Sequence, residues 1–336
     1  MLNNVCKYLR IDDWLDSKVP FMISVVMLLY LYTDNNISCI DMYLLVGAYF
    51  LYISMFLAFS YVINDFTDME IDKKAGKIKV MHMLPRPVIV ITMISMILLG
   101  VLPMLAITKE KILYLIYTFV LYIAGSAYSV PFLLRFKERG FVGLIECSIA
   151  QRCMPLIPVI FLFQTNLILL GVFVILSFVN GIRYILIHQA VDYENDIKTG
   201  VKTFVSEGHK KYKAYIITAF LIECLLFIGI FVWLSINRIY VSCALLLYCL
   251  FEFIIDTVVK KYMKIDLFCT FIAVPLEALY NVFLPVTAAI LLTIENYAYC
   301  GILAFLIILT FRSFKGKFAF VIRLYKIKNK KKALKQ

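Results

Sequence analysis

Long apolar runs, separated by short polar segments, make up most of the chain. A helix that crosses a bilayer needs about 20 apolar residues. The stronger runs are Tyr43–Ile63, Val88–Ile107, Ile112–Val130, Leu167–Ile187, Ala214–Ile236, Tyr240–Val259 and Leu267–Ile294. The shorter or weaker runs are Val19–Tyr32, Phe141–Phe163 and Tyr297–Phe311. Backbone groups in lipid must be paired within the chain, and the alternation typical of barrel strands is absent. The pattern therefore predicts an all-α polytopic membrane protein, a bundle of nine to ten transmembrane helices.

The composition excludes an ordinary soluble protein. Hydrophobic residues make up 63% of the chain, charged residues make up 17%, and the mean hydropathy is +0.89. No polar segment is long enough to fold alone. We therefore expect a single transmembrane domain over residues 1–336, with a basic tail at about residues 312–336.

The basic residues indicate which side of the membrane each loop faces. Lys and Arg gather in alternate loops and in the C-terminal tail, whereas the intervening loops hold only Lys109, Lys111 and Arg238. This distribution follows the positive-inside rule, and it accounts for the net charge of +12 without a nucleic-acid partner. The rule places both termini in the cytoplasm, which requires an even number of crossings. We expect an integral, multi-pass protein of the bacterial cytoplasmic membrane, surrounded by membrane lipid.

Two acidic segments interrupt the apolar chain at matching places on the predicted cytoplasmic side. Residues 64–72, NDFTDMEID, close the second apolar run, and residues 192–200, DYENDIKTG, close the sixth. If the first segment continues the helix before it, Asp65, Asp68 and Asp72 share one face and Asn64 lies beside them.

The second segment has a similar helical spacing. Asp192 and Asp196 are one turn apart, and Tyr184 and His188 extend the same face back towards the membrane. Like charges at this spacing repel, so each cluster is unfavourable unless a cation neutralises it. An isolated pair of this kind is usually a pair of solvated acids at a helix end. Here two clusters share one membrane face with basic residues nearby, which favours a binding site.

The side-chain types indicate which cation the clusters would bind. Oxygen ligands with no Cys and little His select a hard cation such as Mg²⁺. Mg²⁺ usually takes one or two protein carboxylates and completes its coordination with water and substrate phosphate. Two facing clusters therefore predict Mg²⁺ ions around a diphosphate.

Basic residues near the clusters are candidates to bind that diphosphate, because Lys and Arg stabilise the charge of a departing phosphate. The candidates in loops are Arg86, Arg135, Lys137 and Lys202, although cytoplasmic loops are basic in any case. Arg183 lies about two turns inside its apolar run, where a charge needs a partner. Asp192 or a substrate phosphate would serve, and a purely structural ion pair is an equal alternative. The same two interpretations apply to Arg152 and Glu146.

Tyr128 ends the fourth apolar run at the depth of the acidic segments. Its ring either belongs to the aromatic belt at the membrane interface or shields a carbocation, because aromatic faces attract cations.

The combined motifs resemble those of the UbiA superfamily of intramembrane prenyltransferases. Residues 64–72 match the NDxxDxxxD pattern of the family at every fixed position. Further similar segments are Arg86-Pro87, Tyr128-Ser129-x-Pro131 with Arg135, Lys137 and Gly140, and Asp192-x-x-x-Asp196-x-x-x-Gly200-x-Lys202-Thr203. The order and spacing fit from roughly Arg10 to Ile290. Phe132 stands where many members have a second Pro, and Gly200 stands where some have a third Asp.

The resemblance implies a helical bundle around a lateral cavity, in which Mg²⁺ ions hold an isoprenyl diphosphate. Loss of diphosphate leaves an allylic carbocation, which an aromatic or lipid-like acceptor attacks. Motif matching implies a metal or diphosphate role for Asn64, Asp65, Asp68, Asp72, Asp192 and Asp196. It implies diphosphate contacts for Arg86, Lys137 and Lys202.

Two rival functions stay open from the sequence. A UbiA-type membrane terpene cyclase needs the same site but quenches its carbocation internally. A transporter using intramembrane acids is disfavoured, because the acidic clusters lie only at cytoplasmic helix ends. Neither the acceptor, nor the prenyl chain length, nor the oligomeric state follows from the motifs.

Overall fold

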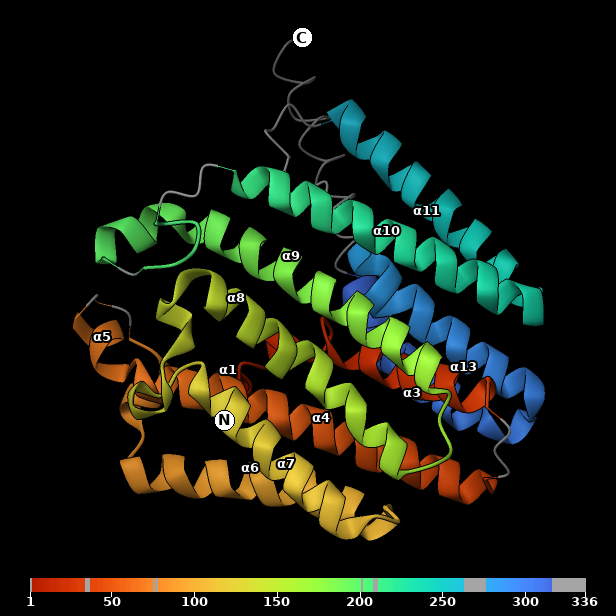
Figure 1. Cartoon of the computed structure of the whole chain (residues 1–336), viewed down its shortest axis with the longest axis horizontal. Helices are drawn as coiled ribbons and strands as arrows, with labels where there is room; N and C mark the ends of the chain where they lie inside the picture. Colours follow the sequence, from red (N-terminus) through yellow and green to blue (C-terminus); the bar gives the residue numbers. More distant parts are fainter. Residues whose placement is uncertain are drawn as a thin grey trace.

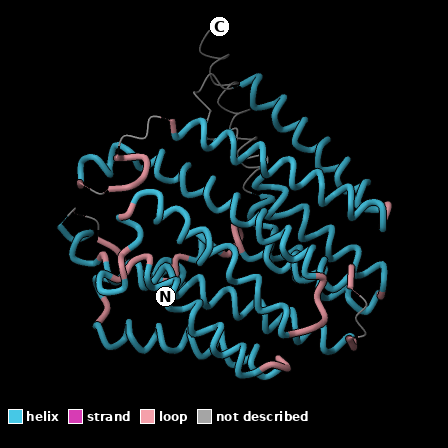
Figure 2. Tube along the Cα trace, in the orientation of Figure 1, coloured by secondary structure: helices cyan, strands magenta, loops and turns pink. Residues whose placement is uncertain are grey.

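The structure is a computed structural model that describes residues 2–33, 37–74, 76, 78–200, 202–207, 211–262 and 276–315 (Figure 1). Throughout these ranges the regular secondary structure is helical, which confirms the all-α prediction (Figure 2). Most of the predicted basic tail, and the first residues of the predicted run Leu267–Ile294, lie outside the described residues.

Where the structure describes them, the ten predicted apolar runs correspond to helices. Among the described residues, 7 helices are long and apolar enough to cross a membrane. They are α4 (Cys39–Thr67), α6 (Arg86–Ile107), Gly140–Phe161, which begins with α8 (Gly140–Ser148), α9 (Leu167–Thr199), α10 (Tyr212–Asn237), Leu276–Glu295, which ends with α13 (Leu284–Glu295), and Tyr297–Lys315. Shorter apolar helices are α3 (Val19–Leu31), α7 (Lys111–Ala127) and the stretch Tyr240–Ile254 of α11 (Tyr240–Tyr262).

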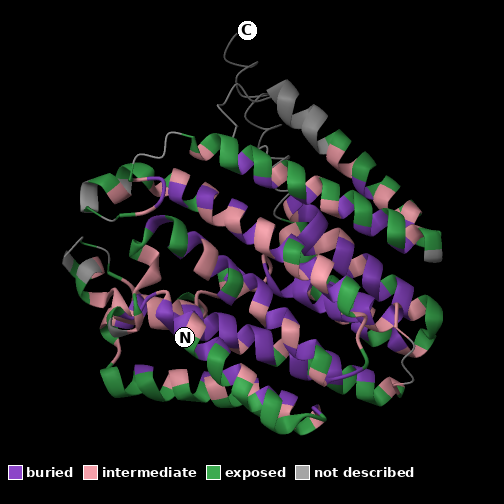
Figure 3. Cartoon of the chain, viewed as in Figure 1, coloured by how far each residue is buried: buried purple, intermediate pink, exposed green. Residues whose placement is uncertain are grey.

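The helices pack as a bundle with an apolar outer surface. α4 packs against α6 and α7, α9 packs against α8 and α10, and α3 packs against α13. Buried positions concentrate inside the bundle, and α6, α10 and α11 carry many exposed ones (Figure 3). Exposed side chains on these helices include Ile91, Leu225 and Leu246. A surface of this kind suits lipid, so the chain is an integral, multi-pass membrane protein.

Gly140–Phe161 is not a regular α-helix along its length. α8 gives way to a π-helical turn at Ile149–Cys153, followed by 3₁₀ turns over Met154–Phe161. Pro155 causes the change, because it lacks an N–H group for the carbonyl of Gln151 and its ring crowds that carbonyl. Hydroxyl groups from neighbouring helices bind carbonyls of the irregular stretch: Tyr117 donates to the Met154 oxygen at 2.7 Å, and Tyr49 donates to the Pro155 oxygen at 3.0 Å.

The two ends of the described chain meet at the same end of the bundle. Arg312 lies near the end of the last described helix. It forms ion pairs with Asp12 and Asp16 of the N-terminal segment, residues 2–18, which contains the short helices α1 (Leu2–Tyr8) and α2 (Ile11–Trp14). The distance between Arg312 Nε and Asp16 Oδ2 is 3.6 Å. This arrangement agrees with the even number of crossings that the charge distribution requires.

A fully buried ion pair joins α9 to α10. Arg183 Nε lies 2.5 Å from Glu223 Oε1, and both side chains are 0% exposed. Asn180 and Tyr280 also donate hydrogen bonds to the Glu223 carboxylate, at 3.2 and 2.8 Å. Arg183 therefore has a carboxylate partner, as expected for a charge at this depth, but the partner is Glu223 and not Asp192. The contact supports the structural interpretation of Arg183.

We predict that Glu223→Gln destabilises the protein strongly. Removal of the carboxylate leaves a buried guanidinium without its counter-charge, which costs about 3–5 kcal/mol and lowers the Tm by about 5–10 °C. Thermal unfolding of the purified protein in detergent measures this shift. Glu295→Gln is the matched control, because Glu295 pairs with Arg238 at a site where its side chain is 45% exposed, and such pairs contribute little. Equal Tm values for the two variants would contradict the role of the buried pair.

Candidate active site

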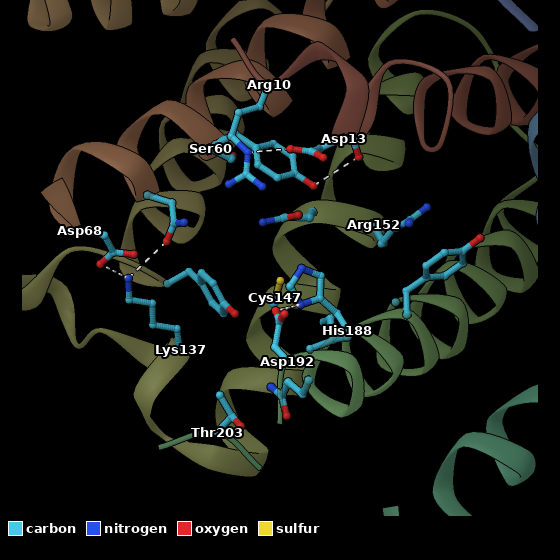
Figure 4. A pocket seen from close by; sticks show the side chains of 18 of the residues that line it. Arg10, Asp13, Ser60, Asp68, Lys137, Cys147, Arg152, His188, Asp192 and Thr203 are labelled. Carbon is cyan, nitrogen blue, oxygen red and sulfur yellow. Dashed lines mark hydrogen bonds and ion pairs between the residues drawn. The ribbon is translucent and has the colours of Figure 1, made fainter. Parts of the chain in front are cut away.

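A cavity of about 640 Å³ opens between α4, α9, the irregular helix after α8 and the N-terminal segment. Both acidic segments contribute to its wall (Figure 4). Asn64, Asp68 and Asp72 come from one side, and Asp192 and Asp196 come from α9. The structure thus brings together two segments that lie more than 100 residues apart in the chain.

The first acidic segment does not continue α4 as one helix, so that prediction is wrong. α4 ends at Thr67, and Asp68 caps it with φ −94° and ψ 0°. A short helix, α5 (Met69–Lys74), follows. Asp68 and Asp72 line the cavity, whereas Asp65 is 5% exposed and is not part of the lining.

Lys79 neutralises two of these acids from the loop after α5. Its Nζ atom lies 2.7 Å from Asp65 Oδ1 and 2.7 Å from Asp72 Oδ2. Arg10 of the N-terminal segment approaches Asp65 at 3.4 Å. Burial acts to lower the pKa of Lys79, but the hydrogen bonds with the two carboxylates outweigh it, so the pKa is raised. The repulsion expected among the acids is therefore relieved by basic side chains.

Lys137 and Arg135 neutralise Asp68 from the loop after α7. Lys137 forms an ion pair with Asp68 and donates to Asn64 Oδ1 at 3.3 Å, and Arg135 Nη2 lies 3.3 Å from Asp68 Oδ1 (Figure 4). Ser129 also donates to Asn64 Oδ1, at 2.8 Å. Burial lowers the pKa of Lys137, and the Asp68 carboxylate offsets this only in part.

The loop that carries Arg135 and Lys137 has a strained backbone. Leu134 and Arg135 have φ values of 110° and 47°, a region that non-glycine residues rarely occupy. The Lys137 amide donates to the Tyr128 carbonyl oxygen at 3.1 Å, which folds the loop back beside Tyr128. At Gly143 of α8, an added Cβ would lie 2.3 Å from the Phe136 carbonyl oxygen. The absence of a side chain at Gly143 lets the loop pack closely against α8.

In the second acidic segment, Asp192 is less neutralised than the acids of the first segment. His188 Nδ1 lies 2.9 Å from Asp192 Oδ2, and the Asp192 side chain is 44% exposed. No described Lys or Arg pairs with Asp192. Thr203 donates to Asp196 Oδ2 at 3.2 Å. Gly200 caps α9 with φ 71°, a left-handed conformation that explains a glycine at this position.

Three of the predicted diphosphate contacts do not line the cavity. Arg86 is exposed and lies 3.9 Å from Glu70, Lys202 is exposed, and Arg183 is buried with Glu223. Arg135, Lys137 and Tyr128 do line it. The sequence-based prediction also missed Arg10, Lys18 and Lys79, whose only signal was their place in basic segments next to the apolar runs.

The oxygen donors fit a Mg²⁺ ion that a substrate completes. No group of three or more described His, Cys, Asp or Glu side chains is close enough to hold a metal ion alone. Mg²⁺ needs only one or two carboxylates when water and phosphate oxygens fill its remaining positions. Asn64, Asp68 and Asp72 on one side, and Asp192 and Asp196 on the other, offer donors of this type in one cavity.

Comparison with known proteins identifies the fold. The model of the UbiA prenyltransferase family matches residues 19–271. A UbiA homologue from Archaeoglobus fulgidus bound to GPP and Mg²⁺ is 18% identical, with a TM-score of 0.53, over 85% of this chain and 99% of that chain. The same protein bound to DMAPP and Mg²⁺ is 17% identical, with a TM-score of 0.52, and the match again covers 85% of this chain and 99% of that chain. A UbiA homologue from Aeropyrum pernix K1 without ligand is 11% identical, with a TM-score of 0.56, over 82% and 97%. No curated protein matches the chain.

We predict that Gly143→Ala loosens the loop that carries Arg135 and Lys137. The added Cβ displaces the Phe136 backbone, so trypsin cleavage after Arg135, Lys137 or Arg139 speeds up by about threefold or more. Limited proteolysis followed by mass spectrometry measures the rate at each bond. Gly171→Ala is the control, because a Cβ at Gly171 meets no atom within 4 Å. Equal cleavage rates in the two variants would show that Gly143 does not hold the loop.

Proposed function

The chain belongs to the UbiA prenyltransferase family, and we propose that it transfers an isoprenyl group from an isoprenyl diphosphate to an aromatic or lipid-like acceptor, with Mg²⁺ as cofactor. One observation carries the proposal: both acidic segments and two basic side chains, Arg135 and Lys137, line one cavity of an apolar helical bundle. A polyprenyl tail is apolar and its diphosphate is highly charged, so the substrate needs these two environments side by side.

The acidic residues have a metal-binding role in this proposal. The residues that would hold Mg²⁺ at the diphosphate are Asn64, Asp68, Asp72, Asp192 and Asp196. Asp65 would support them by holding Lys79, which also pairs with Asp72. When bound, Mg²⁺ supplies charge stabilisation for the diphosphate leaving group. The archaeal homologue bound to GPP and Mg²⁺ supports this choice of cation.

The basic side chains of the cavity have a complementary role. Lys137 and Arg135 are held at Asp68, where they can turn from the carboxylate to phosphate oxygens when the substrate binds. Their charges then stabilise the diphosphate as it departs. Lys79 lies next to the same site through its contact with Asp72.

The reaction exchanges one bond for another. The bond between C1 of the isoprenyl group and the diphosphate oxygen breaks, and its electron pair leaves with diphosphate. The resulting allylic cation forms a bond with a nucleophilic atom of the acceptor, which then loses a proton. Tyr128 lines the cavity, and its ring would shield the cation from water.

We also propose that the cavity faces the cytoplasm of a bacterial cell. The loops near the cavity are rich in basic residues, among them Lys79, Arg135 and Lys137, and the positive-inside rule assigns such loops to the cytoplasm.

The test is diphosphate release by the purified chain in nanodiscs, with isoprenyl diphosphates of several lengths and with Mg²⁺ or EDTA. We expect Mg²⁺-dependent release that rises on addition of a lipid or aromatic extract, with a prenylated product in mass spectrometry. A cyclic product without any acceptor would identify a terpene cyclase instead. No release from folded protein would contradict both enzyme functions and revive the transporter.

We predict that Asp68→Ala and Asp192→Ala each reduce turnover by at least about 100-fold, because each removes a charge that positions the metal and diphosphate. The release assay measures turnover, and size-exclusion chromatography confirms that the variants insert and fold. Glu110→Ala is the control, since Glu110 is exposed in the loop before α7 and does not line the cavity. Normal turnover in either aspartate variant would remove the metal-site assignment.

A further inference from the structure

Five basic side chains line the cavity, and two of them have no carboxylate partner among the described residues. Arg135 and Lys137 pair with Asp68, and Arg10 pairs with Asp13 and Asp65. Lys18 and Arg152 form no ion pair with any described residue. The two unpaired cations therefore differ from the other three, although all five share one cavity.

Both unpaired cations are removed from bulk water. Lys18 and Arg152 are each 7% exposed. Lys18 Nζ donates one hydrogen bond, to Gln151 Oε1 at 2.6 Å, and an ammonium group has two further donors. Arg152 makes no hydrogen bond to the described part of the chain, although a guanidinium has five donors. A buried charge in this state is costly unless a counter-charge binds.

Asp12, Asp13 and Glu146 do not supply that counter-charge. Asp13 is engaged by Arg10, and Asp12 by Arg312. Glu146, a candidate partner of Arg152 from the sequence, does not line the cavity, and neither of its buried carboxylate oxygens finds a hydrogen-bond partner in the described structure. The structural ion pair considered for Arg152 and Glu146 is therefore not formed.

The two cations also act on each other. Burial, followed by the positive charge of Arg152, lowers the pKa of Lys18 to about 7. The other groups that act on Lys18 are Cys147, Arg10 and Asp13, and they do not reverse this shift. A bound anion would favour the charged form of Lys18 and relieve the repulsion between the two side chains.

The irregular helix after α8 places this pair at the cavity wall. Gln151 and Arg152 both belong to the π-helical turn Ile149–Cys153, a type of irregularity that often occurs at functional sites. The aromatic ring of Tyr61 lies 4.9 Å from Lys18 Nζ, and the ring of Tyr184 lies 5.0 Å from the Arg152 guanidinium carbon. Each cation thus stands next to an aromatic ring that also lines the cavity.

Arg152 lies away from Asp68 of the first acidic segment. Figure 4 shows Arg152 on the opposite side of the cavity from Asp68 and Lys137, with His188 and Asp192 between them. A diphosphate held at Asp68 and Asp192 would therefore leave room at Arg152 for a second negatively charged group.

We propose that Lys18 and Arg152 form a second anion-binding subsite, which holds a carboxylate or phosphate group of the acceptor. The inference rests on the proposed function, because it assigns the anion to the molecule that receives the isoprenyl group. The rings of Tyr61 and Tyr184 offer apolar surface for the part of the acceptor attached to that anion.

The test measures anion binding while the diphosphate site is filled. The full-length chain in phosphatidylcholine nanodiscs is saturated with Mg²⁺ and geranyl thiodiphosphate, and equilibrium dialysis then measures binding of radiolabelled benzoate, phenyl phosphate and benzamide. We expect benzoate or phenyl phosphate to bind at least about tenfold more tightly than neutral benzamide. Tighter binding of benzoate would indicate an acceptor with a carboxylate group, and tighter binding of phenyl phosphate would indicate an acceptor with a phosphate group.

Variants tie the binding to the two side chains. We expect Lys18→Gln and Arg152→Gln each to weaken anion binding at least about tenfold, and Arg152→Lys to keep part of it. Lys111→Gln removes an exposed positive charge from the first residue of α7, outside the cavity lining, and should change nothing. Size-exclusion chromatography reports that each variant is folded, and binding of geranyl thiodiphosphate reports that its diphosphate site is intact.

Several outcomes would overturn the subsite. They are equal binding of benzamide and both anions, no anion binding to the wild type, or unchanged anion binding in both glutamine variants. If Arg152→Gln and Lys18→Gln both lost binding of geranyl thiodiphosphate, the two side chains would belong to the diphosphate site instead. Failure of the wild type to bind geranyl thiodiphosphate would contradict the proposed function alone, provided that anion binding still depends on Lys18 and Arg152.

Discussion

Carboxylates at the edge of an apolar bundle must be neutralised where they stand, because repulsion between them is weakly screened there. In this protein basic side chains from three separate segments meet that requirement, and the first is Arg10, which approaches Asp65. Lys79 bridges Asp65 and Asp72, and Lys137 with Arg135 holds Asp68. Two features of the loop after α7 bring Arg135 and Lys137 to Asp68. One is the strained turn at Leu134 and Arg135, and the other is the close packing of the loop against Gly143.

The two sides of the cavity differ in a way that suits the proposed reaction. The first acidic segment is neutralised by the chain itself, whereas Asp192 on α9 is paired only with His188 among the described residues. In our proposal, these side chains exchange partners when an isoprenyl diphosphate binds: the carboxylates would hold Mg²⁺, which would stabilise the diphosphate charge, and the basic side chains would turn to the phosphates. The exchange keeps every charge paired, so substrate binding does not leave a bare charge at the membrane edge. Lys18 and Arg152 stand outside the exchange, which is why we assign them a different anion.

Much of this arrangement could be predicted from the sequence, because it depends on local patterns. Apolar runs predicted the helices, and helical spacing with residue type identified the acids of both segments. Arg135 and Lys137 were candidates because they are basic residues in a loop near those acids. The remainder depends on tertiary contacts. The pairing of Arg183 with Glu223 requires knowing that α10 packs on that face of α9, and hydrophobic periodicity does not identify neighbours. Arg86 and Lys202 share the predicted cytoplasmic side with the cavity, but a basic loop residue can point away from it, as both do. Helical spacing likewise did not predict the break of α4 at Asp68.

The central claim is that the acidic segments bind metal together with a diphosphate and not without it. Electron paramagnetic resonance of Mn²⁺, as a substitute for Mg²⁺, tests it directly on the purified chain in nanodiscs. The account predicts weak Mn²⁺ binding to the protein alone, because Lys79, Lys137 and Arg135 already occupy the carboxylates. Addition of geranyl thiodiphosphate should tighten Mn²⁺ binding at least about tenfold, since phosphate oxygens complete the coordination. Equally tight Mn²⁺ binding with and without geranyl thiodiphosphate would contradict the account.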